Sequence, residues 1–297
     1  MENRSKHPLS TDMKFTHHDR TYDFQWGSRT YVMGILNVTP DSFSDGGQFR
    51  SIESAIVQAK KMRDAGVDIL DIGGQSTKPN AEPVALSEEL DRVIPVVKAL
   101  REDSSFDSVA ISIDTTVAEV AKAAIEAGGD LINDVSGATF DTQMLATVAQ
   151  LQVPIILMHL RGTPKTMQQL TEYTDLTGEI IAWLSDRIQS AVNAGIPRDW
   201  IMIDPGIGFA KTAEQSLELL QKLDQFRSLN APILVGPSRK SFIGKILDQP
   251  EAQKRVWGTA AACCAAIARG ADLVRVHDVA EMMDVVRVAD AVWRMNK

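Results

Sequence analysis

The chain alternates short apolar runs with longer amphipathic segments, and this alternation constrains the fold more than any other feature. Eight runs rich in Val, Ile and Leu follow one another: YVMGILN, VDILDIGG, VAISIDT, LINDVSG, PIILMH, IMIDPG, PILVGPS and LVRVH. Each is the length of one strand, and its nearly continuous apolar character is typical of a parallel strand buried on both faces. The segments between the runs have the spacing of helices, so we expect an α/β protein.

The number and spacing of these repeats favour a closed barrel over an open sheet. Residues 31–297, divided among eight units, leave about 33 residues for each, the size of one βα repeat. An open doubly wound sheet would favour a G-x-G-x-x-G turn after the first strand, but NVTPDSFSDGG stands there. We therefore predict a single-domain TIM (β/α)8 barrel over residues 21–297.

The segment before the first strand differs from the rest of the chain. Residues 1–20 are polar and are expected to form a loose N-terminal arm. Residues 21–30, TYDFQWGSRT, place aromatic and β-branched residues around Gly27. This pattern is compatible with a short β-hairpin that closes the bottom of the barrel.

The composition argues against several classes of protein. A net charge of −8 argues against a nucleic-acid partner or an anionic membrane surface, although it permits a local basic pocket. No stretch approaches the roughly 20 apolar residues of a membrane span, and the N-terminus lacks the apolar centre of a secretory signal. Cys263 and Cys264 are adjacent and are not expected to form a disulfide with each other. A cytoplasmic location fits these features.

Polar residues stand at the carboxyl ends of the predicted strands, where TIM barrels place their active sites. They are Asn37, Asp71, Asp114, Asn133, Asp134, His159, Asp204, Ser238, Arg239, Lys240, Ser241, Arg275 and His277. Taken singly, Asp114 could cap the next helix, Asn133 could brace a turn, and His159 could bond within the rim. Their convergence on one end of the barrel favours a binding site.

The cations follow the last two strands, where barrels often bind phosphate. Lys240, Arg275 and His277 would form an anion site there, helped by the N–H groups of a helix that starts near Ser241. Arg239 could instead be solvated or lie at an interface. These residues predict a ligand with an anionic leaving group.

The middle strands contribute mainly hydrogen-bond acceptors. Asp114, Asn133 and Asp204 suit the edge of a heterocycle that displays N–H donors. A carboxylate accepts two parallel N–H bonds from a guanidine-like edge, and an aminopyrimidinone has such an edge. The strand ends therefore predict a substrate with two unlike ends.

Eight segments closely resemble, in order, the motifs of the dihydropteroate synthase family. They are MGILNVTPDSFSDGG, DIGGQSTKP, SIDT, INDVSG, ILMH, IDPGIGFAK, GPSRKSFIG and VRVHDV, and the resemblance extends from Met33 to Val288. It implies a TIM barrel that requires Mg2+ and forms a homodimer. The family is also a target of sulfonamides.

The resemblance implies a particular reaction. The family joins 6-hydroxymethyl-7,8-dihydropterin diphosphate to 4-aminobenzoate and releases diphosphate, which makes 7,8-dihydropteroate for folate biosynthesis. The transferred group is an alkyl group other than methyl. The electron-rich dihydropterin can spread positive charge from its exocyclic methylene, so C–O cleavage ahead of amine attack is the expected route. Mg2+ and cations would neutralise the leaving group.

The resemblance also assigns roles to single residues. Lys240, Arg275 and His277 would be catalytic, and Asn37 would be the protein contact of the Mg2+–diphosphate. The pterin and diphosphate would be bound by Asn37, Asp114, Asn133, Asp204, Lys240, Arg275 and His277. The aminobenzoate would be bordered by Phe43, Thr77, Pro79, Phe209 and Ser241.

Two loops, VTPDSFSDGG and GGQSTKPNAEP, are rich in Gly, Ser and Pro and are expected to close over the site as lids. Asp45 and Lys78 would take part in this closure. Lys78 stands where the family usually has an arginine. A lysine keeps the charge but loses the planar fork, which puts a bidentate role at this position in doubt.

Two other functions are compatible with such a barrel. A pterin-binding methyltransferase would share the pterin pocket but needs no diphosphate site, so the retained SRKS segment with Arg275 and His277 counts against it. A non-catalytic pterin-binding paralogue would be expected to lose some of Asn37, Lys240 or His277. All three are present.

Overall fold

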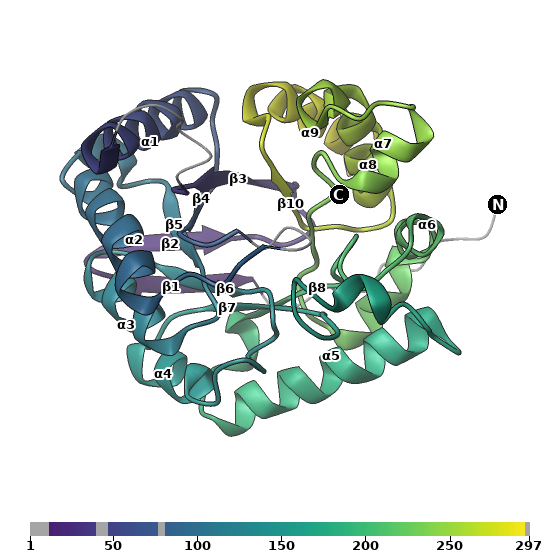
Figure 1. Cartoon of the computed structure of the whole chain (residues 1–297), viewed down its shortest axis with the longest axis horizontal. Coiled ribbons are helices and arrows are strands. Elements are labelled where there is room, and N and C mark those ends of the chain that lie inside the picture. The colour runs from purple at the N-terminus through teal and green to yellow at the C-terminus, as the bar shows by residue number, and fades with distance from the viewer. Residues whose placement is uncertain (1–11, 40–46, 77–80, 295–297) are drawn as a thin grey trace.

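The computed structural model describes residues 12–39, 47–76 and 81–294. Within these residues, eight parallel strands form a barrel that helices surround (Figure 1). The strands are β3 (Tyr31–Asn37), β4 (Ile69–Gly73), β5 (Ala110–Asp114), β6 (Leu131–Asp134), β7 (Ile155–Met158), β8 (Ile201–Asp204), β9 (Leu234–Val235) and β10 (Leu273–Val276). Each predicted apolar run contains one of them.

The helices follow the strands in alternation, as the sequence predicts. They are α1 (Gly47–Asp64), α2 (Leu86–Arg101), α3 (Ala118–Glu126), α4 (Met144–Leu151), α5 (Leu176–Asn193), α6 (Ala213–Gln221), α7 (Ser241–Ile246), α8 (Val256–Ala268) and α9 (Val279–Trp293). In the described part of the chain, no helix is both long and apolar enough to cross a membrane.

The sheet closes on itself. Hydrogen-bonded neighbours run β8-β7-β6-β5-β4-β3-β10-β9, and every pairing in this sheet is parallel. A bridge between Ile203 and Ile233 joins the two ends, where the Ile203 N–H donates to the Pro232 carbonyl at 2.9 Å. The predicted (β/α)8 barrel is confirmed.

The interior of the barrel has an apolar layer near its bottom. Each strand contributes one buried side chain to this layer: Met33, Ile69, Ala110, Leu131, Ile156, Met202, Leu234 and Leu273. Because side chains alternate along a strand, residues two positions later also point inward. These residues include Asp71, Asn133, Asp204 and Arg275, so strand alternation places a polar layer directly above the apolar one.

A hairpin of β1 (Met13–His17) and β2 (Arg20–Phe24) packs its alternate residues against the apolar layer. The predicted hairpin is confirmed, but it lies earlier in the chain than expected. Its turn falls at His18 and Asp19, which both have positive φ, and not around Gly27. Residues 13–20, assigned to a polar arm from the sequence, therefore belong to the hairpin. The arm before residue 12 lies outside the described residues.

Candidate active site

Arg275 on β10 joins two carboxylates across the polar layer. Its Nε donates to Asp71 Oδ2 at 2.5 Å, and its Nη2 donates to Asp114 Oδ2 at 2.6 Å. Burial opposes the charge of the guanidinium, but the two carboxylates outweigh this cost and raise the pKa of Arg275. Asp114 therefore pairs with Arg275 and does not cap α3, whose N-cap is Val117.

Asp71 is a site residue that the sequence predicts among the polar strand ends but without an individual role. Its side chain is wholly buried on β4, and its Oδ2 accepts from Asn133 Nδ2 at 3.0 Å in addition to Arg275. The amide N–H group of Asn133 is thereby used, and its carbonyl oxygen remains as an acceptor. Asp71 thus holds two residues that are predicted to bind the pterin, Asn133 on β6 and Arg275 on β10.

Asp204 ends β8 and stands directly before a tight turn. Its Oδ1 accepts from the Gly206 N–H at 2.7 Å. Burial raises the pKa of Asp204 to about 6, against the opposing effects of the Gly206 N–H and the Lys240 ammonium. Gly206 has φ +73, and a Cβ there would lie 2.1 Å from the His159 carbonyl oxygen, so this turn requires glycine.

Lys240 follows β9, the neighbour of β8 in the closed barrel, and precedes α7. Its Nζ is 3.8 Å from the centroid of the Phe209 ring, a cation–π contact. Burial and the neighbouring Arg275 lower the pKa of Lys240 to about 8, although Asp204 and Asp114 favour the charged form. Lys240, Asp204, Asp114 and Arg275 therefore form one electrostatic unit, as the strand ends predict.

His277 follows β10 and is held by Ser238. The Ser238 hydroxyl accepts from the His277 backbone N–H at 3.1 Å and lies 2.9 Å from Nδ1. Arg239 is not a solvated cation, because it forms a bidentate ion pair with Asp278 in which Nε lies 3.0 Å from Oδ2. This pairing leaves Lys240 as the pocket cation of the segment.

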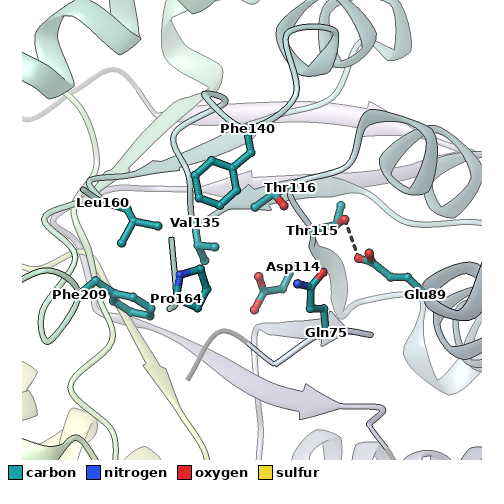
Figure 2. Close-up of a pocket in the computed structure, with 10 residues that line it drawn as sticks. All are labelled: Gln75, Glu89, Asp114, Thr115, Thr116, Val135, Phe140, Leu160, Pro164 and Phe209. Atoms are coloured by element: carbon teal, nitrogen blue, oxygen red, sulfur yellow. Dashed lines mark hydrogen bonds between the residues drawn. The ribbon is translucent and has the colours of Figure 1, made fainter. Parts of the chain in front are cut away.

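A pocket opens beside Asp114 at the carboxyl end of the barrel (Figure 2). Figure 2 shows that its two sides differ in character. Gln75, Glu89, Thr115 and Thr116 accompany Asp114 on the polar side. The apolar side consists of Val135, Phe140, Leu160, Pro164 and Phe209. Such a pocket suits a flat ring with one polar edge.

The remaining predicted residues divide into two groups. Asn37 ends β3 with a half-buried side chain, and Ser241 begins α7 with an exposed one; neither is among the residues that line the pocket. Phe43, Asp45, Thr77, Lys78 and Pro79 lie outside the described residues. Their roles stay predictions.

The described residues contain no group of three or more His, Cys, Asp or Glu side chains arranged to hold a metal ion. A divalent cation in this region would need oxygen ligands from other sources. Asn37 offers one amide oxygen at the strand ends. This donor set fits Mg2+, which usually keeps several waters and binds substrate phosphates together with one or two protein ligands.

A closed (β/α)8 barrel with a carboxylate–guanidinium cluster at its carboxyl end defines a barrel enzyme whose site takes a polar heterocycle and an anion. The chain belongs to the pterin-binding enzyme family, whose pattern matches residues 33–277, and within that family to the dihydropteroate synthases. These enzymes are alkyltransferases that condense a pterin diphosphate with 4-aminobenzoate in folate synthesis.

Similar proteins agree on this membership. The dihydropteroate synthase of Synechocystis sp. is 59% identical over 91% of this chain and 93% of its own length. The structure of Xanthomonas albilineans dihydropteroate synthase with 4-aminobenzoic acid is 40% identical, with a TM-score of 0.86 over 95% of this chain and 98% of that one. The same enzyme in complex with 7,8-dihydropteroate gives 38% identity and a TM-score of 0.83, over 94% and 98% of the two chains.

Proposed function

We propose that this chain joins 6-hydroxymethyl-7,8-dihydropterin diphosphate to 4-aminobenzoate in the polar layer of its barrel. The observation that carries the proposal is the bridge from Arg275 to both Asp71 and Asp114, at 2.5 and 2.6 Å. It places a cation between buried acceptors at the carboxyl ends of the strands. Such an arrangement meets both the polar edge of a pterin and the negative charge of its diphosphate.

The pterin edge would be bound by acceptors from three strands. Asp204 and Asp114 accept N–H bonds, and Asn133 presents its carbonyl oxygen because Asp71 occupies its N–H group. Hydrogen bonds to charged groups contribute about 1.5–3 kcal/mol each, so these carboxylates would supply much of the pterin affinity. Arg275 would lie against the ring face while it retains its carboxylate partners.

The diphosphate would be stabilised by cations from the last two strands. The Ser238 hydroxyl accepts from the His277 backbone, so its own proton is available to His277 Nδ1. The imidazole proton then resides on Nε2, which can donate to a phosphate oxygen. Lys240 and Arg275 add positive charge, and charge on the departing group is what a dissociative C–O cleavage must stabilise.

Mg2+ is proposed as the metal of the reaction, with Asn37 as its protein contact. When bound, the ion would neutralise part of the charge on the leaving diphosphate. Asn37 would orient the diphosphate at the end of β3, which pairs with β10 and so lies beside the strands that carry the cations. This proposal rests on the family and on the fit of a single amide donor.

The 4-aminobenzoate would enter beside Phe209, whose ring faces Lys240 and the pocket. An aniline-type amine is nucleophilic when neutral, so no strong base is needed. The chain has only to orient this amine towards the exocyclic carbon and exclude water. Ser241, Phe43, Thr77 and Pro79 are proposed to complete this side of the site.

A homodimer and a cytoplasmic location are also proposed. Helices α7, α8 and α9 are neighbours (Figure 1). Exposed apolar side chains lie on these helices or directly after them, among them Ile246, Leu247 and Trp257, which is 76% exposed. A second copy of the chain would cover this face. Sedimentation of the wild type and of Trp257→Glu tests the dimer, and a monomeric wild type would contradict it. Cys263 and Cys264 are both free, as in a reducing compartment.

Calorimetric titration with the pterin diphosphate tests the assignment of the site. Lys240→Met and Asp114→Asn should each weaken binding at least about tenfold. Lys222→Met is the matched control, because Lys222 is an exposed lysine that pairs with Glu218 on α6. Wild-type affinity in both site variants would contradict the proposed placement of the pterin.

A further inference from the structure

Lys211 is a buried lysine that the proposed reaction does not use. It is 3% exposed and lies between β8 and α6, just after Phe209. Its Nζ donates to the Phe209 carbonyl at 2.8 Å and lies 3.0 Å from His159 Nδ1. Lysine is almost never fully buried without a compensating role, so both contacts require an explanation.

His159, which directly follows β7, acts as the hydrogen-bond acceptor of Lys211. Burial lowers the pKa of Lys211 to about 7, although Asp204 favours the charged form, and that form only donates. His159 therefore accepts through Nδ1 and carries its own proton on Nε2. Burial, followed by the charge of Lys211, lowers the pKa of His159 to about 2, which keeps the imidazole neutral. The edge-on contact with Trp183, at 5.0 Å between ring centroids, holds the imidazole plane. His159 is thus a rigid acceptor for Lys211.

The Lys211 ammonium lies beneath the turn that presents Asp204. A Cβ at Gly206 would be 3.3 Å from Lys211 Nζ, and the N–H of the same glycine binds the Asp204 carboxylate at 2.7 Å. The far end of the turn is closed by the Phe209 N–H, which donates to the Gly206 carbonyl at 3.0 Å. Lys211 therefore bonds to the end of the turn at Phe209 and lies close to its start at Gly206.

The chain between Phe209 and Lys211 is strained. Ala210 has φ +50, a left-handed conformation that costs a residue with a Cβ roughly 1–2 kcal/mol. The Lys211 bond to the Phe209 carbonyl spans this residue, and Tyr173 donates its hydroxyl to the Ala210 carbonyl at 3.0 Å. Without these bonds the segment would relax and take the Phe209 ring with it.

We propose that Lys211 is a positioning residue for both substrates. Its ammonium, fixed by the Phe209 carbonyl and the His159 imidazole, holds the turn so that the Asp204 carboxylate meets the pterin and the Phe209 ring borders the aminobenzoate. Lys211 touches neither substrate and acts through these two residues. The inference rests on the proposed function, because it needs both substrates in the places given above.

The test compares Lys211→Met with the control Lys222→Met. Lys211→Met should raise the KM for both substrates about tenfold or more, with a smaller change in kcat. On the acid side of the pH profile, where Asp204 gains a proton, the pH at which pterin affinity falls by half should also rise. Lys211, the Gly206 N–H, Lys240 and Arg275 all favour the charged form of Asp204, and the variant lacks one of these. A folded Lys211→Met with unchanged KM values and an unchanged midpoint would overturn the proposal.

A second pair of variants decides the matter if Lys211→Met does not fold. His159→Asn retains an acceptor near the position of Nδ1, whereas His159→Leu removes it. The proposal expects the asparagine variant to keep a KM within about threefold of the wild type and the leucine variant to lose about tenfold. Equal effects in both would overturn it. Calorimetric pterin affinity is measured on every variant, so a wild type that binds but does not turn over would refute the proposed reaction and leave the test of Lys211 intact.

Discussion

The Asp71 carboxylate, which is wholly buried in the barrel, accepts a hydrogen bond at Oδ2 from Arg275 Nε at 2.5 Å. Breaking a buried ion pair by removing one partner costs about 3–5 kcal/mol, since the other charge is left without compensation. Asp71→Ala should therefore lower the free energy of unfolding by about 3 kcal/mol in urea titrations, because Arg275 retains Asp114. It should also weaken pterin binding, because Arg275 and Asn133 lose their common anchor.

Ser112→Ala provides the control for this prediction. Ser112 pairs with Asp71 in the strand register, and its hydroxyl is buried without a hydrogen-bond partner among the described residues. Its removal should change neither stability nor pterin affinity appreciably. An Asp71→Ala protein as stable as Ser112→Ala, with wild-type affinity, would show that the bridge has no such role.

The pH dependence of kcat/KM for the pterin diphosphate should follow Asp114, Asp204 and Lys240. Asp114 must be ionised to accept from the pterin, and burial raises its pKa to about 7 although Arg275 favours the charged form. Asp204 must be ionised to accept from the pterin, and burial raises its pKa to about 6. Lys240 must be protonated to act as a cation, and burial lowers its pKa to about 8. Activity should therefore decline below about pH 7, where first Asp114 and then Asp204 gain a proton, and above pH 8, where Lys240 loses one.

A separate variant tests the acid side and the alkaline side of this pH profile. Asp204→Asn should remove the part of the acid limb near pH 6, leave the part due to Asp114, and cost about 1.5–3 kcal/mol of pterin affinity. Lys240→Arg should remove the alkaline limb, because an arginine stays charged at these pH values. Profiles of the two variants that keep both limbs in place would assign the limbs to other groups.

Lys78 is expected to act in closure of the second loop, although it lies outside the described residues. Lys78→Arg should be tolerated and should lower the KM for 4-aminobenzoate, since the planar fork allows a bidentate contact. Steady-state kinetics with each substrate varied will measure this. If Lys78→Ala leaves turnover and both KM values unchanged, the position has no role in catalysis.

The aminobenzoate pocket is expected to be complete only when Mg2+ and diphosphate are present. The two loops rich in Gly, Ser and Pro offer few apolar anchors, so charge contacts of Asp45 and Lys78 would drive their closure. A sulfonamide would then bind only the closed state, with its affinity reduced by the closed fraction. Titrations with and without Mg2+–diphosphate, and with the pterin site empty or filled, test this order. Equal affinity in all four would indicate a preformed pocket.

The sequence could predict the barrel and most of the pterin site because strand periodicity sets both. Asn133, Asp204 and Arg275 point inward two residues after the apolar layer, and Asp114 does so four residues after Ala110, so the sequence contains this even spacing. The role of Asp71 could not be read in this way, because its partner Arg275 is 204 residues away and only closure of the barrel joins them.

Two other features of the structure could not be predicted from the sequence, for local reasons. The hairpin turn at His18 and Asp19 has no glycine, although MKFTH already alternates apolar and polar residues. Lys211 is the last residue of the motif IDPGIGFAK, but the motif does not show whether this lysine is buried or solvated. Its burial depends on the packing of β7 against β8 and on the turn at Gly206, and the amino-acid sequence alone shows neither.

The most direct test of the proposed function is the stoichiometry of product formation. The purified chain is supplied with Mg2+, 6-hydroxymethyl-7,8-dihydropterin diphosphate and 4-aminobenzoate, and dihydropteroate and diphosphate are quantified together. We predict equal amounts of the two products, formed only when both substrates are present and lost in Lys240→Met. Pterin binding without either product, or diphosphate release that does not depend on 4-aminobenzoate, would contradict the proposed condensation.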